Sequence, residues 1–248
     1  PTNKPDVRRA ADLVEELCRV YGYDKIPVPE KIQISFPRPS QSAYVLKSRL
    51  SNWLAANGLC EMMNLSLVRS ELCLKTGLWS ENQLVYIHNT SNIQLDALRP
   101  AIFLGGLESV QFNVNRQQQD LKMFETGKVF IREGNEVREK SVMGIWLYGS
   151  HRGMHWKEKE QAQDFFGLKS IANALLELTN IRKYETRGIQ GNGLYAFGLE
   201  YFAGSKTLIR AGLIRREIAD LFDLKKELWF AELDLDAMLD LFSEKPVA

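Results

Sequence analysis

A run of alternating residues in the second half of the chain is the strongest constraint on the fold. Residues 194–214, LYAFGLEYFAGSKTLIRAGLI, read as two strands interrupted only by Gly204 and Ser205. A two-residue connection that contains Gly is typical of an antiparallel hairpin. Similar patterns predict further strands at residues 63–68, 84–89, 121–131, 142–149 and 228–236, and helices at 100–113, 165–179, 215–222 and 236–242. The sequence therefore predicts an α+β fold, with helices packed against an antiparallel sheet.

Prolines divide the N-terminal part from the rest of the chain. Residues 6–21 have helical apolar spacing that ends at Gly22, and four prolines follow: Pro27, Pro29, Pro37 and Pro39. A second helix is predicted over residues 41–57, and we expect its apolar stripe to be buried: Leu46, Leu50, Trp53 and Leu54. We predict a short helical remnant of a preceding domain over residues 1–29, a connector over 30–39 and the main module over 40–248.

Composition excludes some classes of protein and leaves others open. The 248 residues are 45% hydrophobic, which is enough for a large core, and the formal net charge is only +1. Any contact with nucleic acid would therefore need a local basic patch. No apolar run is long enough to span a membrane, and the polar opening PTNKPDVRR does not resemble a signal peptide. We expect a cytoplasmic protein, with its three cysteines as free thiols, and the start without Met suggests part of a longer protein.

Carboxylates gather on the first predicted helix. Asp12, Glu15 and Glu16 are spaced i, i+3 and i+4, which places them in one sector of a helix, and Asp6 lies upstream. Magnesium prefers such oxygen ligands. Spacing alone favours a solvated acidic face that neighbouring arginines balance. The residues by themselves leave both interpretations open.

Glu125 is the second candidate for chemistry. It belongs to the predicted strand LKMFETGKVF, residues 121–130, and strand alternation alone does not decide between a nucleotide site and the polar side of a pleat. The sequence contains no Walker loop, no GxSxG elbow and no dinucleotide-binding fingerprint. We therefore assign no catalytic residue.

Five phrases, taken in order, resemble one known family. They are RRAADLVEELCRVYGYDKIP, NGLCEMMNLSLV, LDALRPAIFLGGLESVQFNVNRQQQDLKMFETGKVF, DFFGLKSIANALLEL and ELWFAELDLDAML. Together they run along nearly the whole chain and are similar to the beta subunits of bacterial phenylalanine–tRNA ligases. The resemblance covers the end of a small nucleic-acid-binding-like domain and the catalytic-like module that follows it.

The resemblance implies a class II synthetase-like core that does not itself catalyse. In catalytic members a strand arginine and a Phe-Glu strand grip ATP, and a later helix supplies another arginine. Glu125 matches the Phe-Glu element, and Arg99 or Arg116 could be the first arginine. The last element carries Asp234, Asp236 and Asp240 instead, which would repel a triphosphate. Glu125 is therefore interpreted as a structural relic.

The same resemblance implies partners and a metal. The module would be a scaffold for the alpha subunit, in a heterotetramer of two alpha and two beta subunits that attaches phenylalanine to its tRNA using ATP. The family's magnesium site, shared with the alpha subunit, would fall on four residues: Asp6, Asp12, Glu15 and Glu16. The outer face of the second helix, including Tyr44, Arg49 and Asn52, is the expected contact surface. Two alternatives remain: a module that forms the adenylate itself, and a free-standing synthetase-like regulatory or binding protein.

Overall fold

The computed structural model describes residues 6–28, 42–89, 92, 94–151 and 161–242. The chain separates into two compact units, Pro1–Pro39 and Ser40–Ala248. The predicted connector, residues 30–39, lies outside the described residues. In the first unit, α1 (Ala10–Tyr21) is followed by the short 3-10 turn η1 (Tyr23–Lys25). The apolar stripe of α1 is largely exposed, at Leu13, Val14, Leu17, Val20 and Tyr21.

A seven-stranded sheet forms the second unit, in the order β1-β5-β6-β10-β9-β8-β7. All neighbours are antiparallel except β1 and β5. The strands are β1 (Cys60–Glu61), β5 (Leu121–Glu133), β6 (Glu136–Tyr148), β7 (Glu185–Asn192), β8 (Tyr195–Ala203), β9 (Lys206–Ile214) and β10 (Leu228–Asp234). The predicted hairpin is confirmed, because Ala203 pairs with Lys206 across Gly204, whose φ of 59° suits a residue without a side chain.

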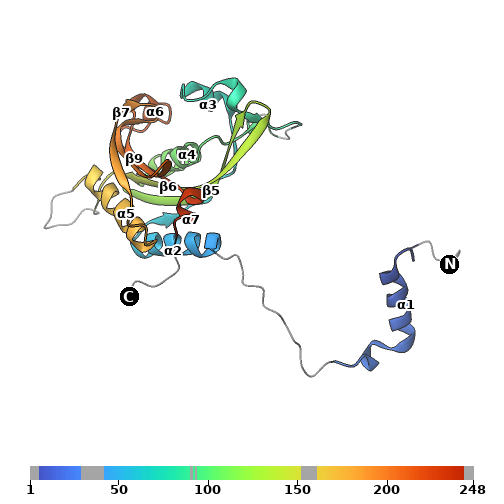
Figure 1. Cartoon of the computed structure of the whole chain (residues 1–248). Helices are drawn as coiled ribbons and strands as arrows, with labels where there is room; N and C mark the ends of the chain where they lie inside the picture. The colour runs from blue at the N-terminus through green and yellow to red at the C-terminus, as the bar shows by residue number, and fades with distance from the viewer. Residues whose placement is uncertain (1–5, 29–41, 90–91, 93, 152–160, 243–248) are drawn as a thin grey trace. The chain divides into compact units, whose positions relative to one another are not determined.

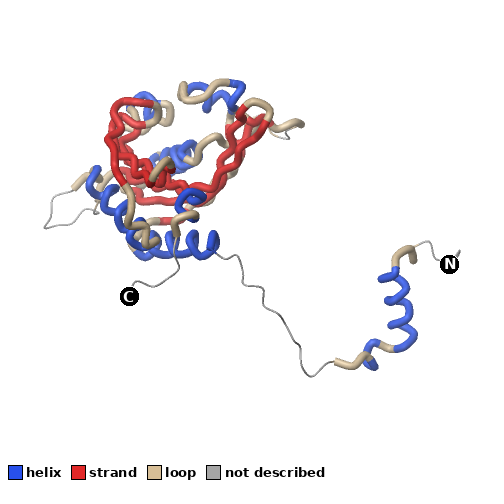
Figure 2. The backbone as a smooth tube through the Cα atoms, viewed as in Figure 1, coloured by secondary structure: helices blue, strands red, loops and turns tan. Residues whose placement is uncertain are grey.

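Helices cover both faces of this sheet (Figures 1 and 2). One face packs against α2 (Ser42–Ala56), α5 (Phe165–Leu178) and α7 (Leu235–Leu239). The concave face holds α4 (Phe103–Val114), together with α3 (Ser70–Lys75) and α6 (Arg216–Asp220). A small second sheet, β2-β4-β3, is built from β2 (Leu67–Val68), β3 (Val85–Tyr86) and β4 (Ala97–Leu98), with η2 (Glu81–Gln83) beside it. The predicted α+β class with an antiparallel sheet flanked by helices is thus confirmed for this unit.

Helix α2 is anchored by its apolar stripe. Leu46, Leu50 and Leu54 are at most 1% exposed and belong to the core between the helices and the sheet. Trp53 packs against this core as expected, but it is only partly buried, so the expectation of burial holds for it only in part. The physical reason is that Trp53 lies at the margin of the stripe, where neighbouring elements cover the side chain only in part. Within the described part of the chain, no helix is both long and apolar enough to cross a membrane.

Candidate functional site

Glu125 lies on β5, one strand in from the β1 edge of the sheet, and its carboxylate is fully engaged by other residues of the chain. The side chain is 2% exposed and pairs with Arg99, whose Nη1 lies 2.6 Å from Oε1. Asn64 donates from its side chain to Oε2, at 2.7 Å, and from its backbone to Oε1, at 3.3 Å. A buried charge pair is stable only when such hydrogen bonds satisfy both partners. The carboxylate therefore holds three segments together rather than facing a ligand.

Gly127 explains why the sequence reads FETG. It lies two residues beyond Glu125 on the same face of β5, and a Cβ there would overlap Nη2 of Arg99. The Nε of Arg99 donates to the carbonyl of Lys128 at 2.9 Å, which fixes the guanidinium above this gap. Arg116, the other arginine considered for a phosphate contact, lies instead over the ring of Phe112. The Phe-Glu strand β5 thus binds the side chain of Arg99 from the same chain.

Trp146 fills the neighbouring space on the concave face. Its indole lies against Gly144 of β6 and Gly106 of α4, and a Cβ at either glycine would overlap the ring. The ring is fully buried, and its Nε1 has no hydrogen-bond partner among the described residues. The side chain of Trp146 and helix α4 therefore fill the space above β6 on the concave face of the sheet.

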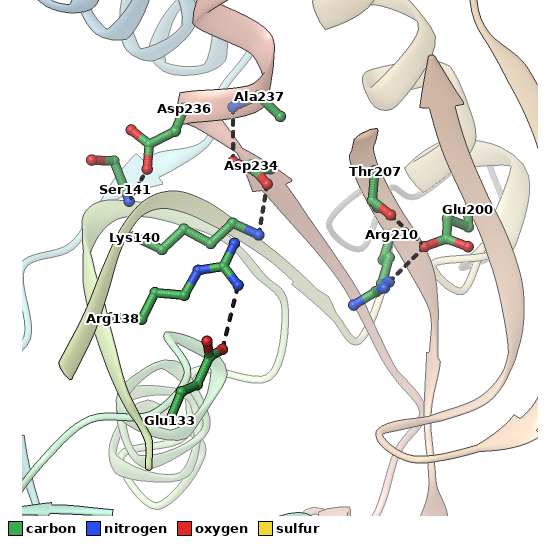
Figure 3. A network of polar contacts seen from close by, with 10 residues as sticks. All are labelled: Glu133, Arg138, Lys140, Ser141, Glu200, Thr207, Arg210, Asp234, Asp236 and Ala237. Atoms are coloured by element: carbon green, nitrogen blue, oxygen red, sulfur yellow. Dashed lines mark hydrogen bonds and ion pairs between the residues drawn. The ribbon is translucent and has the colours of Figure 1, made fainter. Parts of the chain in front are cut away.

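The acidic residues at and just after the end of β10 are each engaged within the chain, and Figure 3 draws the contacts of Asp234 and Asp236. Asp234 caps α7 by accepting from the backbone N–H of Ala237 at 2.9 Å, and it pairs with Lys140 at 2.6 Å. Asp236 accepts from the backbone N–H of Ser141, and Asp240 pairs with Lys206. These carboxylates stabilise the junction of strand and helix, which supports the view that the element is not built for phosphates.

A row of charged side chains crosses four neighbouring strands, β10, β9, β8 and β7, on the concave face of the sheet. Strand pairing places Glu232 opposite Arg210, Arg210 opposite Glu200, and Glu200 opposite Arg187. Glu200 accepts from Arg187 at 2.5 Å, from Arg210 at 2.9 Å and from Thr207 at 2.8 Å (Figure 3 draws the last two). We call Arg187, Glu200, Arg210 and Glu232 the charged row.

The pKa values of the two carboxyls in the charged row are shifted in opposite directions. Burial opposes the ionisation of Glu200, but the hydrogen bonds from Thr207, Arg187 and Arg210 prevail and lower its pKa. At Glu232, burial raises the pKa, and the charges of Lys140 and Arg210 offset this only in part. This row was not predicted from the sequence, although single charged residues within apolar strands are a signal that indicates it.

The four carboxylates predicted to bind magnesium do not gather in the structure. Asp12 accepts from the backbone N–H groups of Arg8 and Arg9, at 3.0 and 2.7 Å, and from the Arg9 guanidinium. These hydrogen bonds, that from Arg8 foremost, lower the pKa of Asp12. Glu16 pairs with Arg19, and Asp6 and Glu15 are exposed. In the ranges that the structure describes, no three His, Cys, Asp or Glu side chains are placed to hold a metal ion.

Comparisons with known proteins identify relatives. The family model described as "Phenylalanyl tRNA synthetase beta chain CLM domain" matches residues 29–235. The phenylalanine–tRNA ligase beta subunit of Protochlamydia amoebophila is 27% identical over the whole chain, and that of Syntrophus aciditrophicus is 30% identical over 98% of it. The chain spans only 32% and 31% of these two relatives.

A solved structure shares the fold. The pyrrolysyl tRNA synthetase PylSc of Desulfitobacterium hafniense aligns with a TM-score of 0.63 over 82% of this chain and 69% of its own. The two sequences are 15% identical, so this likeness concerns the fold alone. Together with the seven-stranded sheet, it places the second unit among synthetase-like folds.

Proposed function

This chain belongs to the family of the phenylalanyl tRNA synthetase beta chain CLM domain, and we propose that it is a non-catalytic scaffold within a phenylalanine–tRNA ligase. The observation that carries the proposal is the buried pair of Arg99 and Glu125. In a nucleotide-binding strand this carboxylate would be available to a ligand, whereas here it is satisfied by Arg99 and Asn64. Trp146 fills the adjacent space against Gly144 and Gly106, which supports the proposal that this part of the sheet does not hold a nucleotide.

The proposal predicts that the purified chain does not form an aminoacyl-adenylate. We expect no phenylalanine-dependent exchange of pyrophosphate into ATP above a blank without protein, because the arginines near the site are paired inside the chain. The measurement is an isotope-exchange assay with an assembled phenylalanine–tRNA ligase as the positive control. A clear exchange signal from the chain alone would overturn the scaffold role in favour of a module that adenylates an amino acid itself.

The scaffold role implies a partner and a compartment. We propose that the chain assembles with an alpha subunit, as two alpha and two beta subunits, and that the assembled enzyme charges phenylalanine tRNA with the use of ATP in the cytoplasm. Residues 1–29 would be the end of a small nucleic-acid-binding-like domain, and residues 40–248 the catalytic-like module. These statements extend from the family to a chain that spans about a third of its relatives.

Helix α2 is the proposed contact surface for the alpha subunit. Tyr44 is 74% exposed and Asn52 is exposed, whereas Arg49 lies over the ring of Phe242, with 5.2 Å between its Cζ and the ring centroid. Arg49 is thus partly engaged within the chain, so its removal would affect both folding and contact. Tyr44 is the cleaner probe, since aromatic residues contribute strongly at interfaces.

We therefore expect Tyr44→Ala to weaken capture of the alpha subunit about tenfold or more while leaving the melting temperature within about 2 °C of wild type. The measurement is a paired pull-down and thermal melt, with Tyr86→Ala, an exposed tyrosine of β3, as the matched control. Unchanged capture by the Tyr44 variant would exclude this face. A wild-type chain that captures no alpha subunit at all would favour a free-standing synthetase-like regulatory or binding protein.

The magnesium assignment to Asp6, Asp12, Glu15 and Glu16 is a proposal about the assembled enzyme only. In the structure Asp12 and Glu16 are bound to neighbouring arginines and the four residues do not fit a metal site, so no step is assigned to the ion. If the ion is bound after assembly, Asp12→Asn with Glu16→Gln should raise the magnesium concentration needed for half-maximal activity. An unchanged magnesium dependence of the assembled enzyme would show that the assignment is wrong.

A further inference from the structure

A cavity of about 520 Å³ lies between the charged row and the apolar residues on the concave side of the sheet. Its walls are aromatic and aliphatic, and its main apolar lining consists of Trp79, Phe103, Ile131, Ile189, Leu194 and Tyr195. Trp79 and Phe103 stack with their ring centroids 5.8 Å apart, so they form one continuous wall. The volume is in the range of small-molecule sites, and apolar walls with a few polar groups are typical of such sites.

One carboxyl in this cavity, that of Glu232, has no hydrogen-bond partner among the described residues. The described residues donate no hydrogen bond to the carboxyl of Glu232, and none forms an ion pair with it. The charged and titratable groups that face it are Arg210 of β9, Lys140 of β6, Tyr195 of β8 and Asp234 of its own strand. Lys140 is paired with Asp234, and Arg210 with Glu200. Glu232 is thus the carboxyl of the cavity that is left to accept a hydrogen bond.

We propose that this cavity binds an organic ammonium ion, a primary amine on an apolar or aromatic body, with the ammonium on Glu232 and the body against Trp79, Phe103 and Tyr195. A charge-assisted hydrogen bond would satisfy the carboxyl, and aromatic faces attract a cation that approaches them. An anion fits less well, since it would meet Glu232 and compete with Glu200 for Arg187 and Arg210.

This site goes beyond the proposed scaffold role and does not depend on it. The cavity uses none of the residues that carry that role: Arg99, Glu125, Gly127 and Trp146 are outside its lining. Failure of amine binding would therefore leave the scaffold proposal standing. Detection of pyrophosphate exchange would in turn leave the amine site standing.

The test is calorimetric titration of the purified chain with phenethylamine. We expect saturable binding that weakens at least about tenfold in Glu232→Gln, which corresponds to one charge-assisted hydrogen bond. Glu177→Gln, an exposed glutamate of α5 on the other face of the sheet, should bind like wild type. A second variant, Ala101→Trp, places a large ring in the lining and should abolish binding while the chain stays folded.

Two further measurements test which charged group of the ligand the cavity recognises. Because only the ionised carboxylate pairs with ammonium, binding should be weaker at about pH 5 than at about pH 8, and Glu232→Gln should lose this difference. Phenylpropionate, which has the same body with a carboxylate, should not bind. Absence of saturable phenethylamine binding, equal binding by Glu232→Gln, or tighter binding of phenylalanine than of phenethylamine would overturn the proposal. The last result would mean that the arginines, and not Glu232 alone, select the ligand.

Discussion

Replacing Arg99 by methionine should lower the free energy of unfolding of this chain by about 3–5 kcal/mol, because it leaves Glu125 buried without its counter-charge. Both side chains are only 2% exposed, so solvent cannot compensate for the missing guanidinium. The backbone contacts of Arg99, to Ser66 and Phe130, would remain, so the change reports on the side chain. The measurement is urea unfolding followed by circular dichroism.

The control for this experiment is Arg69→Met. Arg69 pairs with Glu108 at 2.8 Å, but the two side chains are 51% and 43% exposed, and exposed ion pairs contribute little. The double variant Arg99→Met with Glu125→Met should regain much of the loss, because an apolar pair of similar size replaces the ion pair without stranding a charge. If the free energy of unfolding of Arg99→Met lies within about 1 kcal/mol of the wild-type value, the ion pair does not stabilise the sheet as described.

Local sequence patterns predicted much of the architecture. The hairpin at Gly204 follows from a two-residue turn between alternating segments, and the buried face of α2 follows from the spacing of Leu46, Leu50 and Leu54. Each of these features depends on residues close together in the chain. Trp53 shows the limit of this reasoning: helical spacing placed it on the stripe, but how deeply a margin position is buried depends on neighbouring elements.

The groups that define the candidate site could not be predicted in this way. Arg99 and Glu125 are 26 residues apart, and they meet because the carbonyl of Arg99, just after β4, accepts a hydrogen bond from the backbone N–H of Phe130 in β5. The charged row requires the register of four strands at once, and a shift of one residue would turn its members to the other face. The resemblance to a family supplied the interpretation of Glu125 as structural, and the geometry supplied its physical reason.

Replacing Gly106 by alanine is the second change from which we expect a large effect on stability. The sign of that effect distinguishes helix propensity from a clash with the Trp146 ring. In the interior of α4, Gly→Ala should stabilise the helix by about 1 kcal/mol if helix propensity alone decided. A Cβ at this position would instead overlap the buried ring of Trp146. We expect the clash to prevail, so that Gly106→Ala lowers the free energy of unfolding by about 2–3 kcal/mol, as overpacking of a dense core does.

Thermal and urea unfolding of four variants test this explanation: Gly106→Ala, Gly188→Ala, Trp146→Phe and the double variant of Trp146→Phe with Gly106→Ala. Gly188→Ala in β7 is the matched control, because a Cβ there meets nothing within 4 Å, and it should leave stability nearly unchanged. In a Trp146→Phe background the smaller ring leaves room, so the cost of Gly106→Ala should shrink by at least about 1 kcal/mol in a double-mutant cycle. If Gly106→Ala lowered the free energy of unfolding equally in both backgrounds, the ring of Trp146 would not be the group that fills the space above β6. The absence of room for a ligand there would then need another cause.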